Sequence, residues 1–155
     1  MAKADIKRIR FSYFDRPFYF PERSQLKANL IILFQTEGLG VNAVNYNFCS
    51  DSYLLKLNIA HLNHKTLTDI ITFQYSASKE PVLAEIYISI DRVKENAELY
   101  NTSVLNELLR VIIHGALHLC GYGDKTEAQA VLMRKKENFY LEHFVSRGTK
   151  SIWPF

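Results

Sequence analysis

Two histidines one helical turn apart, His114 and His118, are the residues in this sequence best suited to chemistry. Their spacing lets two imidazole nitrogens on one helix face converge on a single ion. Gly121 follows three residues later, where a left-handed residue ends many helices, and the turn would carry Asp124 toward the histidines. The pattern H-x-x-x-H-x-x-G-x-x-D therefore predicts a three-ligand site with one position left for water, as in a catalytic zinc centre.

A second interpretation makes both histidines ordinary core residues and Asp124 a cap of the following helix. The segment Val104–Cys120 is apolar almost all round, which is typical of a buried helix. Two imidazoles buried there without a metal would each need a separate hydrogen-bond partner. The glycine and the aspartate at these offsets favour the metal site.

Position 115 bears on the kind of reaction. It is Gly, whereas metalloprotease helices of the H-E-x-x-H type carry their general base there. Peptide hydrolysis by that mechanism therefore lacks its base. A bound ion could still lower the pKa of its water toward ~7 and polarise a phosphoryl oxygen, so phosphodiester hydrolysis by a metal-bound water stays available.

The elements around this helix indicate an α+β fold. Strand patterns cover Arg8–Phe14, Val41–Phe48, Ile70–Tyr75 and Val82–Ile90, with the last two as an antiparallel hairpin. Helical patterns cover Pro21–Gly38, Asp51–Leu62 after a Ser50 cap, Asp91–Tyr100, Thr102–Cys120 and Thr126–Phe144, the last with a Thr126/Gln129 capping box. We predict a single compact hydrolase domain over residues 1–155: a small mixed four-stranded sheet, about five helices, and a metal site at the end of a long buried helix.

Composition excludes several classes of protein. The chain has 155 residues, 48% hydrophobic and 23% charged, which is typical of a globular domain rather than a disordered one. The net charge of +3 permits contact with a polyanion. The longest apolar run, Leu30–Phe34, is far below the roughly 20 residues of a membrane helix. No secretory signal is recognised, so we expect a cytoplasmic protein with Cys49 and Cys120 reduced and no disulfide partner.

Several segments resemble one known family. Residues 114–124, HGALHLCGYGD, resemble the signature H-G-x-L-H-L-x-G-Y-D-H of the bacterial YbeY family of metal-dependent endoribonucleases. Leu57 and Asn58 resemble its L-N pair, residues 68–73 its T-D-V-L-S-F segment, and Glu85 to Val93 its D-I-x-I-S-x-D-R-V segment. The likeness covers roughly residues 41–141.

The resemblance implies a compact α+β fold with one zinc ion and single-strand-specific endoribonuclease activity. It implies a role in ribosome quality control and in maturing ribosomal RNA, especially the 3′ end of the small-subunit RNA. Ribosomal RNA and the small ribosomal subunit would be the partners. His114 and His118 fall on the first two metal ligands of the family, and Asp124 falls on the third, which is usually His.

Two departures from the family pattern bear on catalysis. The charge of Asp124 should make the metal a weaker Lewis acid than three neutral imidazoles would. Leu62 stands where the family usually has an Arg, and nearby His64 or Lys65 could supply a cation or proton carrier. These departures leave an alternative: a non-catalytic, zinc-stabilised ribosome-assembly factor that binds RNA or ribosomal protein.

Glu107 and Arg110 share the polar stripe of the same helix with the two histidines. They could orient the metal ligands, or they could form an ion pair with each other. Both interpretations stand at this point.

Overall fold

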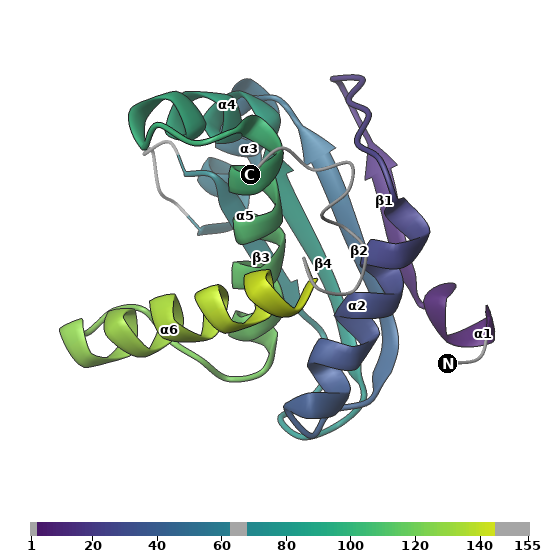
Figure 1. Ribbon diagram of the computed structural model, residues 1–155. Helices are drawn as coiled ribbons and strands as arrows, with labels where there is room; N and C mark the ends of the chain where they lie inside the picture. The colour runs from purple at the N-terminus through teal and green to yellow at the C-terminus, as the bar shows by residue number, and fades with distance from the viewer. Residues whose placement is uncertain (1–2, 63–67, 145–155) are drawn as a thin grey trace.

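A mixed sheet of four strands forms the centre of the structure, a computed structural model that describes residues 3–62 and 68–144 (Figure 1). The strands are β1 (Ile9–Tyr13), β2 (Val41–Cys49), β3 (Ile70–Gln74) and β4 (Val82–Ser89). They lie in the order β1-β2-β4-β3. β2 pairs in parallel with β1 and with β4, and β3 pairs antiparallel with β4. The predicted mixed sheet and its antiparallel hairpin are confirmed.

Five longer helices surround the sheet, as predicted, within the residues that the structure describes. They are α2 (Arg23–Thr36), α3 (Asp51–Leu62), α4 (Ile90–Leu99), α5 (Val104–Leu119) and α6 (Glu127–Phe144). A further helix, α1 (Lys3–Ile6), is a single turn that the sequence analysis did not predict.

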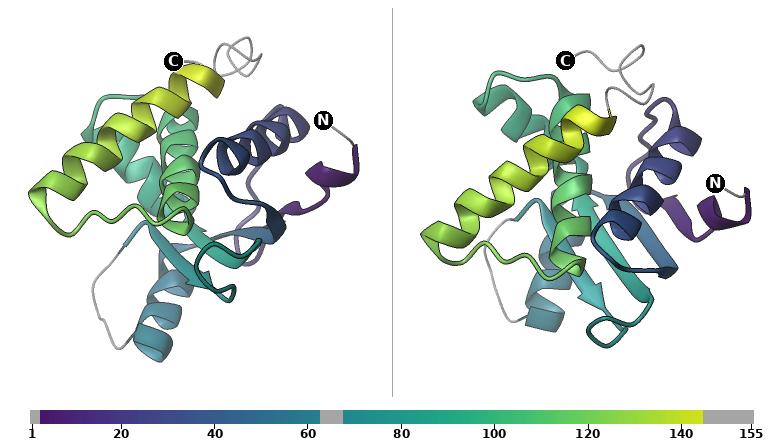
Figure 2. Two further views of the ribbon diagram at one scale, coloured as in Figure 1. Left: turned by 90° about the horizontal axis from the view of Figure 1, so that it is seen from below. Right: turned by 60° about the horizontal axis from the view of Figure 1, so that its bottom comes forward.

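The helices form layers on the two faces of the sheet. Figure 2 shows α2, α5 and α6 on one side and α3 on the other. α5 packs on β3 and β4, and α6 crosses over α5. Because α5 lies between the sheet and α6, one side of it is apolar core and the other faces α6.

Two contacts hold α5 close to the sheet. The hydroxyl of Tyr46, a fully buried residue of β2, donates a hydrogen bond of 3.0 Å to the carbonyl oxygen of Ile112. Gly115 faces the hairpin so closely that a Cβ atom there would lie 2.8 Å from Cδ1 of Ile70 and 3.2 Å from Cδ1 of Ile86. A side chain at position 115 would therefore point into the sheet.

The predicted helix caps are present. The Ser50 hydroxyl accepts a hydrogen bond from the Tyr53 amide at the start of α3. At the start of α6, the backbone N–H of Gln129 donates a hydrogen bond to the Thr126 hydroxyl. The backbone N–H of Thr126 donates one to Oε1 of the Gln129 side chain. This reciprocal pair is the capping box expected from the sequence.

Within the described residues, none of the helices combines the length and the apolar character needed to cross a membrane. Cys49 and Cys120 are both free thiols. Burial raises the pKa of each thiol to about 12, so both stay protonated at neutral pH.

Candidate metal centre

The imidazoles of His114 and His118 meet on the side of α5 that faces α6. Their Nε2 atoms lie 2.9 Å apart, and the two rings are perpendicular. Both side chains are part-buried. The one-turn spacing in the sequence therefore produces the predicted convergence of two nitrogens.

The turn after α5 brings in the third residue. Gly121 adopts a φ of 99°, and the Tyr122 amide donates a hydrogen bond of 3.1 Å to the carbonyl oxygen of Leu117. This pattern is a Schellman motif, which reverses the chain after a helix. As a result, Oδ2 of Asp124 lies 3.4 Å from Nε2 of His114 and 3.3 Å from Nε2 of His118.

Each histidine is held through its other nitrogen. Nδ1 of His114 lies 2.8 Å from Oε2 of Glu137, and Nδ1 of His118 lies 2.8 Å from the carbonyl oxygen of Tyr122. Both partners accept hydrogen bonds, so each Nδ1 carries a proton and donates it. In the neutral rings, Nε2 then has a lone pair that points into the cluster, which is how metal-binding histidines are oriented.

The resulting donor set fits a metal ion. Two imidazole nitrogens and one carboxylate oxygen converge within 4.8 Å of one another. The ligands of a tetrahedral zinc, bound at about 2.0–2.1 Å, are themselves about 3.3 Å apart. The three separations here, 2.9, 3.3 and 3.4 Å, are close to that value. The interpretation of the histidines as ordinary core residues accounts for their Nδ1 partners but not for this convergence.

Negative charge around His114 favours a cation in the cluster. Burial alone would lower the pKa of His114, but the hydrogen bond and the charge of Glu137 outweigh it, with help from Asp124 and Asp69. The net effect raises the pKa of His114. The same field stabilises either a proton on the ring or a metal ion bound to it.

Glu137 connects His114 to Arg110 in a network that the sequence pattern did not predict. Only 4% of the residue is exposed. Its Oε1 accepts a hydrogen bond of 2.9 Å from Arg110, whose other terminal nitrogen binds Asn138 at 3.0 Å. Burial opposes ionisation, but the hydrogen bonds from His114 and Arg110 lower the pKa of Glu137. The carboxylate therefore stays charged beneath His114.

This network distinguishes between the two roles considered for Glu107 and Arg110, which were to orient the histidines or to form an ion pair with each other. Arg110 pairs with Glu137 of α6 and acts on His114 through it, and it does not pair with Glu107. A signal for Glu137 was present in the sequence. It occupies a position on the buried side of α6 together with Met133, Tyr140, Leu141 and Phe144, and a charged residue among such apolar positions needs a partner.

Asp69 joins the same region from the segment before β3. It lines a cavity of about 160 Å³ together with His114 and Glu137. Burial raises the pKa of Asp69. The residues considered as substitutes for the family's Arg, His64 and Lys65, lie outside the described residues, and so does the side chain of Leu62.

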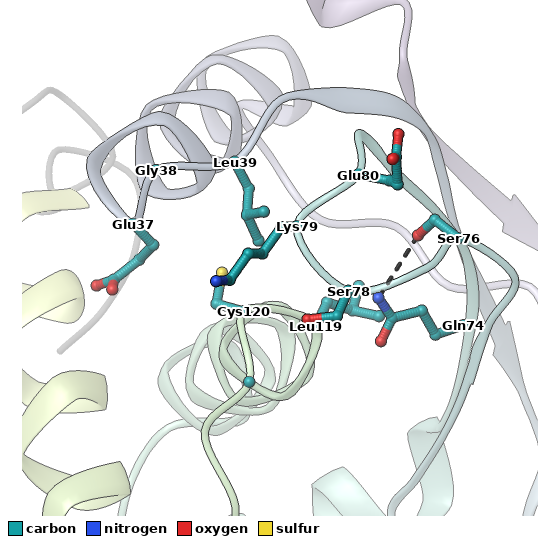
Figure 3. Close-up of a pocket in the computed structure, with 11 residues that line it drawn as sticks. Glu37, Gly38, Leu39, Gln74, Ser76, Ser78, Lys79, Glu80, Leu119 and Cys120 are labelled. Carbon is teal, nitrogen blue, oxygen red and sulfur yellow. Dashed lines mark hydrogen bonds between the residues drawn. The ribbon is translucent and has the colours of Figure 1, made fainter.

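A cavity larger than the one beside His114 lies elsewhere. It measures about 580 Å³ and lies between the end of α5, the β3–β4 turn and the segment after α2. In Figure 3, Lys79 extends toward Cys120 across this space. None of the three converging residues lines it. The chemistry of the donor set, rather than cavity size, therefore locates the candidate site.

Comparisons with known proteins identify the family of the chain. The family model described as endoribonuclease YbeY matches residues 22–145. The chain is 52% identical over 136 residues to a protein of Flavobacterium johnsoniae named endoribonuclease YbeY, covering 88% of this chain and 96% of that protein. A protein of the same name from Flavobacterium psychrophilum is 49% identical over 114 residues, covering 74% and 79% of the two chains.

A solved structure has a similar fold. The solution structure of a Thermotoga maritima protein superimposes with a TM-score of 0.65 and 28% sequence identity, covering 92% of this chain and 93% of that one. The sequence relatives and this structural neighbour extend over most of the chain. The protein therefore belongs to the endoribonuclease YbeY family.

Proposed function

We propose that the chain is a zinc-dependent endoribonuclease of ribosomal RNA maturation, with His114, His118 and Asp124 as the metal ligands. The observation that carries the metal site is the convergence of two Nε2 atoms and one carboxylate oxygen while both Nδ1 atoms are engaged elsewhere. Zinc takes nitrogen and oxygen ligands of these types. Residues 1–155 would form one hydrolase domain around this site.

A bound zinc would activate a water molecule and polarise a phosphoryl oxygen of the RNA. The residues of the chain prepare the site for this. Glu137 and the Tyr122 carbonyl fix the two imidazole planes, and Arg110 balances the charge of Glu137. Three protein ligands leave a coordination position for water or substrate. As a ligand, the negatively charged Asp124 would make a bound zinc a weaker Lewis acid than three imidazoles would.

The substrate is proposed from the family. Single-stranded ribosomal RNA, in particular the unprocessed 3′ end of the small-subunit RNA, is the expected substrate, and the small ribosomal subunit is the expected partner in the cytoplasm. The net charge of +3 is compatible with a polyanionic substrate. Membership of an endoribonuclease family favours cleavage over the alternative of a non-catalytic, zinc-stabilised assembly factor.

The test compares zinc-loaded wild type with His118→Ala on an RNA that carries the unprocessed small-subunit 3′ end. His143→Ala, which removes an imidazole of α6 from outside the donor set, is purified identically as the control. We expect His118→Ala to lose both bound zinc and cleavage, and His143→Ala to keep both. Cleavage by His118→Ala at the wild-type rate would contradict the proposal. Zinc lost without any difference in cleavage would support the assembly factor instead.

A further inference from the structure

Two adjoining cavities form a groove that leads away from the metal centre. They measure about 280 Å³ and 160 Å³ and share Tyr100, Glu107, Arg110 and Arg134. The smaller cavity also reaches His114. Pockets for complete drug-sized ligands are about 300–1,000 Å³. Each cavity is therefore suited to a fragment of a ligand, such as one nucleobase.

Glu107 is the unusual residue of this groove. It is only 7% exposed and lines both cavities. Arg110, the cation nearest in sequence, directs its guanidinium to Glu137 and Asn138. Among the residues that the structure describes, none donates a hydrogen bond to the Glu107 side chain. Burial and the charge of Asp69 raise the pKa of Glu107, against the opposing charges of Arg110 and Arg134. The Glu107 oxygens are not among the buried unpaired atoms of the described residues, and Glu107 lines both cavities, so a ligand that brings N–H groups can bind its carboxylate there.

The other residues of the rim suit a nucleotide. Tyr100, at the end of α4, is 65% exposed and lines both cavities, so its ring is free to stack on a base. The Arg134 side chain is 62% exposed, and its nearest carboxylate oxygen, on Glu137, is 3.6 Å away. Its guanidinium can therefore bind a phosphate. A stacking ring, an acceptor carboxylate and a cation together match one nucleotide.

The position of Glu107 relates this nucleotide to the metal centre. It lies seven residues before His114 on α5, which corresponds to about 10 Å along the helix. A base at Glu107 and a phosphate at the metal centre can therefore belong to neighbouring nucleotides of one strand. The groove would thus read the RNA beside the bond that is cut.

We propose that this groove binds the nucleotide next to the cleaved phosphate and selects guanine through Glu107. A carboxylate offers two acceptor oxygens side by side. The Watson–Crick edge of guanine presents two adjacent donors, N1–H and the N2 amino group. On the Watson–Crick edges of adenine, cytosine and uracil, an acceptor atom lies next to the donor. Its lone pair would face a carboxylate oxygen and be repelled by it. Bases in single-stranded RNA are read on these edges. This inference rests on the proposed function for the identity of the ligand.

The test measures binding without cleavage. Fluorescent U-rich RNA heptamers with one central guanine, inosine or adenine are titrated with protein in EDTA, and affinity is read from fluorescence anisotropy. Inosine lacks the N2 amino group. Wild type should bind the guanine RNA about tenfold more tightly than the adenine RNA, with inosine between them. Glu107→Gln, which has one acceptor and one donor, should reduce the preference to less than about twofold.

Tyr100→Ala serves as a second variant because this exposed residue can be changed without affecting the core. It should weaken binding of all three RNAs about fivefold while the guanine preference remains. Leu99→Ala is the matched control. Leu99 precedes Tyr100 in the sequence, is 72% exposed and lines neither cavity. This variant should bind as wild type does. Equal binding of guanine and adenine RNAs by wild type, or an unchanged preference in a folded Glu107→Gln, would overturn the inference.

Cleavage assays separate this inference from the proposed function. Guanine preference in binding without any zinc-dependent cleavage would support the groove and contradict the nuclease. Cleavage that depends on His118 but is indifferent to guanine and to Glu107→Gln would support the nuclease and overturn the groove.

Discussion

The Glu137 carboxylate lies 2.8 Å from Nδ1 of His114, and it determines that the other nitrogen of that imidazole faces His118 and Asp124. The two residues are 23 positions apart, one on α5 and the other on α6. Carboxylates behind metal-binding histidines fix ring orientation and make the ligand more basic.

Glu137→Gln should weaken zinc binding about 10- to 100-fold, because the amide keeps a hydrogen-bond acceptor but loses the charge. Zinc affinity is measured by competition with a chromogenic chelator. Glu142→Gln, at an exposed position of the same helix, is the control and should bind zinc as wild type does. Unchanged affinity in Glu137→Gln would mean that the charge of Glu137 does not contribute to zinc binding.

Asp124→Ala should weaken zinc binding by more than about tenfold, whereas Asp124→His should retain the metal, because an imidazole can replace the carboxylate oxygen. The same competition assay gives both values. Lys125→Ala changes the exposed neighbour and serves as the control. If Asp124→Ala binds zinc normally while His118→Ala does not, Asp124 is not a ligand.

Glu37 anchors the turn that carries Asp124, and its contribution to stability should depend on pH. Its carboxylate accepts hydrogen bonds from Tyr122 at 2.8 Å, Tyr140 at 2.6 Å and Lys136 at 3.0 Å. Burial alone would raise the pKa of Glu37, but these three donors outweigh it and hold the pKa below the ordinary value of 4.5. The folded state therefore binds the proton less tightly than the unfolded state does.

A carboxylate with a lowered pKa stabilises the protein fully above its unfolded pKa and loses that contribution as the pH falls through the folded pKa. Glu37→Gln should therefore reduce the free energy of unfolding by about 2 kcal/mol at pH 7. The difference in the free energy of unfolding between wild type and Glu37→Gln should stay constant down to about pH 5. It should become smaller below the ordinary carboxyl pKa of 4.5. Urea titrations from pH 3 to 7 measure it. A difference that does not change across this range would refute the role of the Glu37 charge.

Gly115→Ala should lower the free energy of unfolding by about 1 kcal/mol. The added methyl would crowd Ile70 and Ile86, and overpacking costs about 1–3 kcal/mol, whereas alanine improves helix propensity by about 1 kcal/mol. Combining Gly115→Ala with Ile70→Val, which removes the contacting Cδ1, should recover part of the loss. Urea denaturation measures all three proteins, and a Gly115→Ala variant more stable than wild type would disprove the close packing.

The sequence by itself determined the parts that depend on neighbours in the chain. The spacing of His114 and His118, the turn at Gly121 and the arrival of Asp124 all lie within eleven residues, so helix period and turn chemistry specify them. The hairpin and the caps at Ser50 and Thr126 are local in the same way. The single turn α1 was missed because a helix of four residues has too few hydrogen bonds to leave a periodic signal.

Only the tertiary structure decided how the site is supported. Glu137 reaches His114 because α6 crosses α5, and Tyr122 reaches Glu37 across 85 residues. The groove at Glu107 exists because residues from α4, α5 and α6 meet there. Such contacts depend on how helices pack against one another, and the residue spacing within any single segment carries no information about that packing.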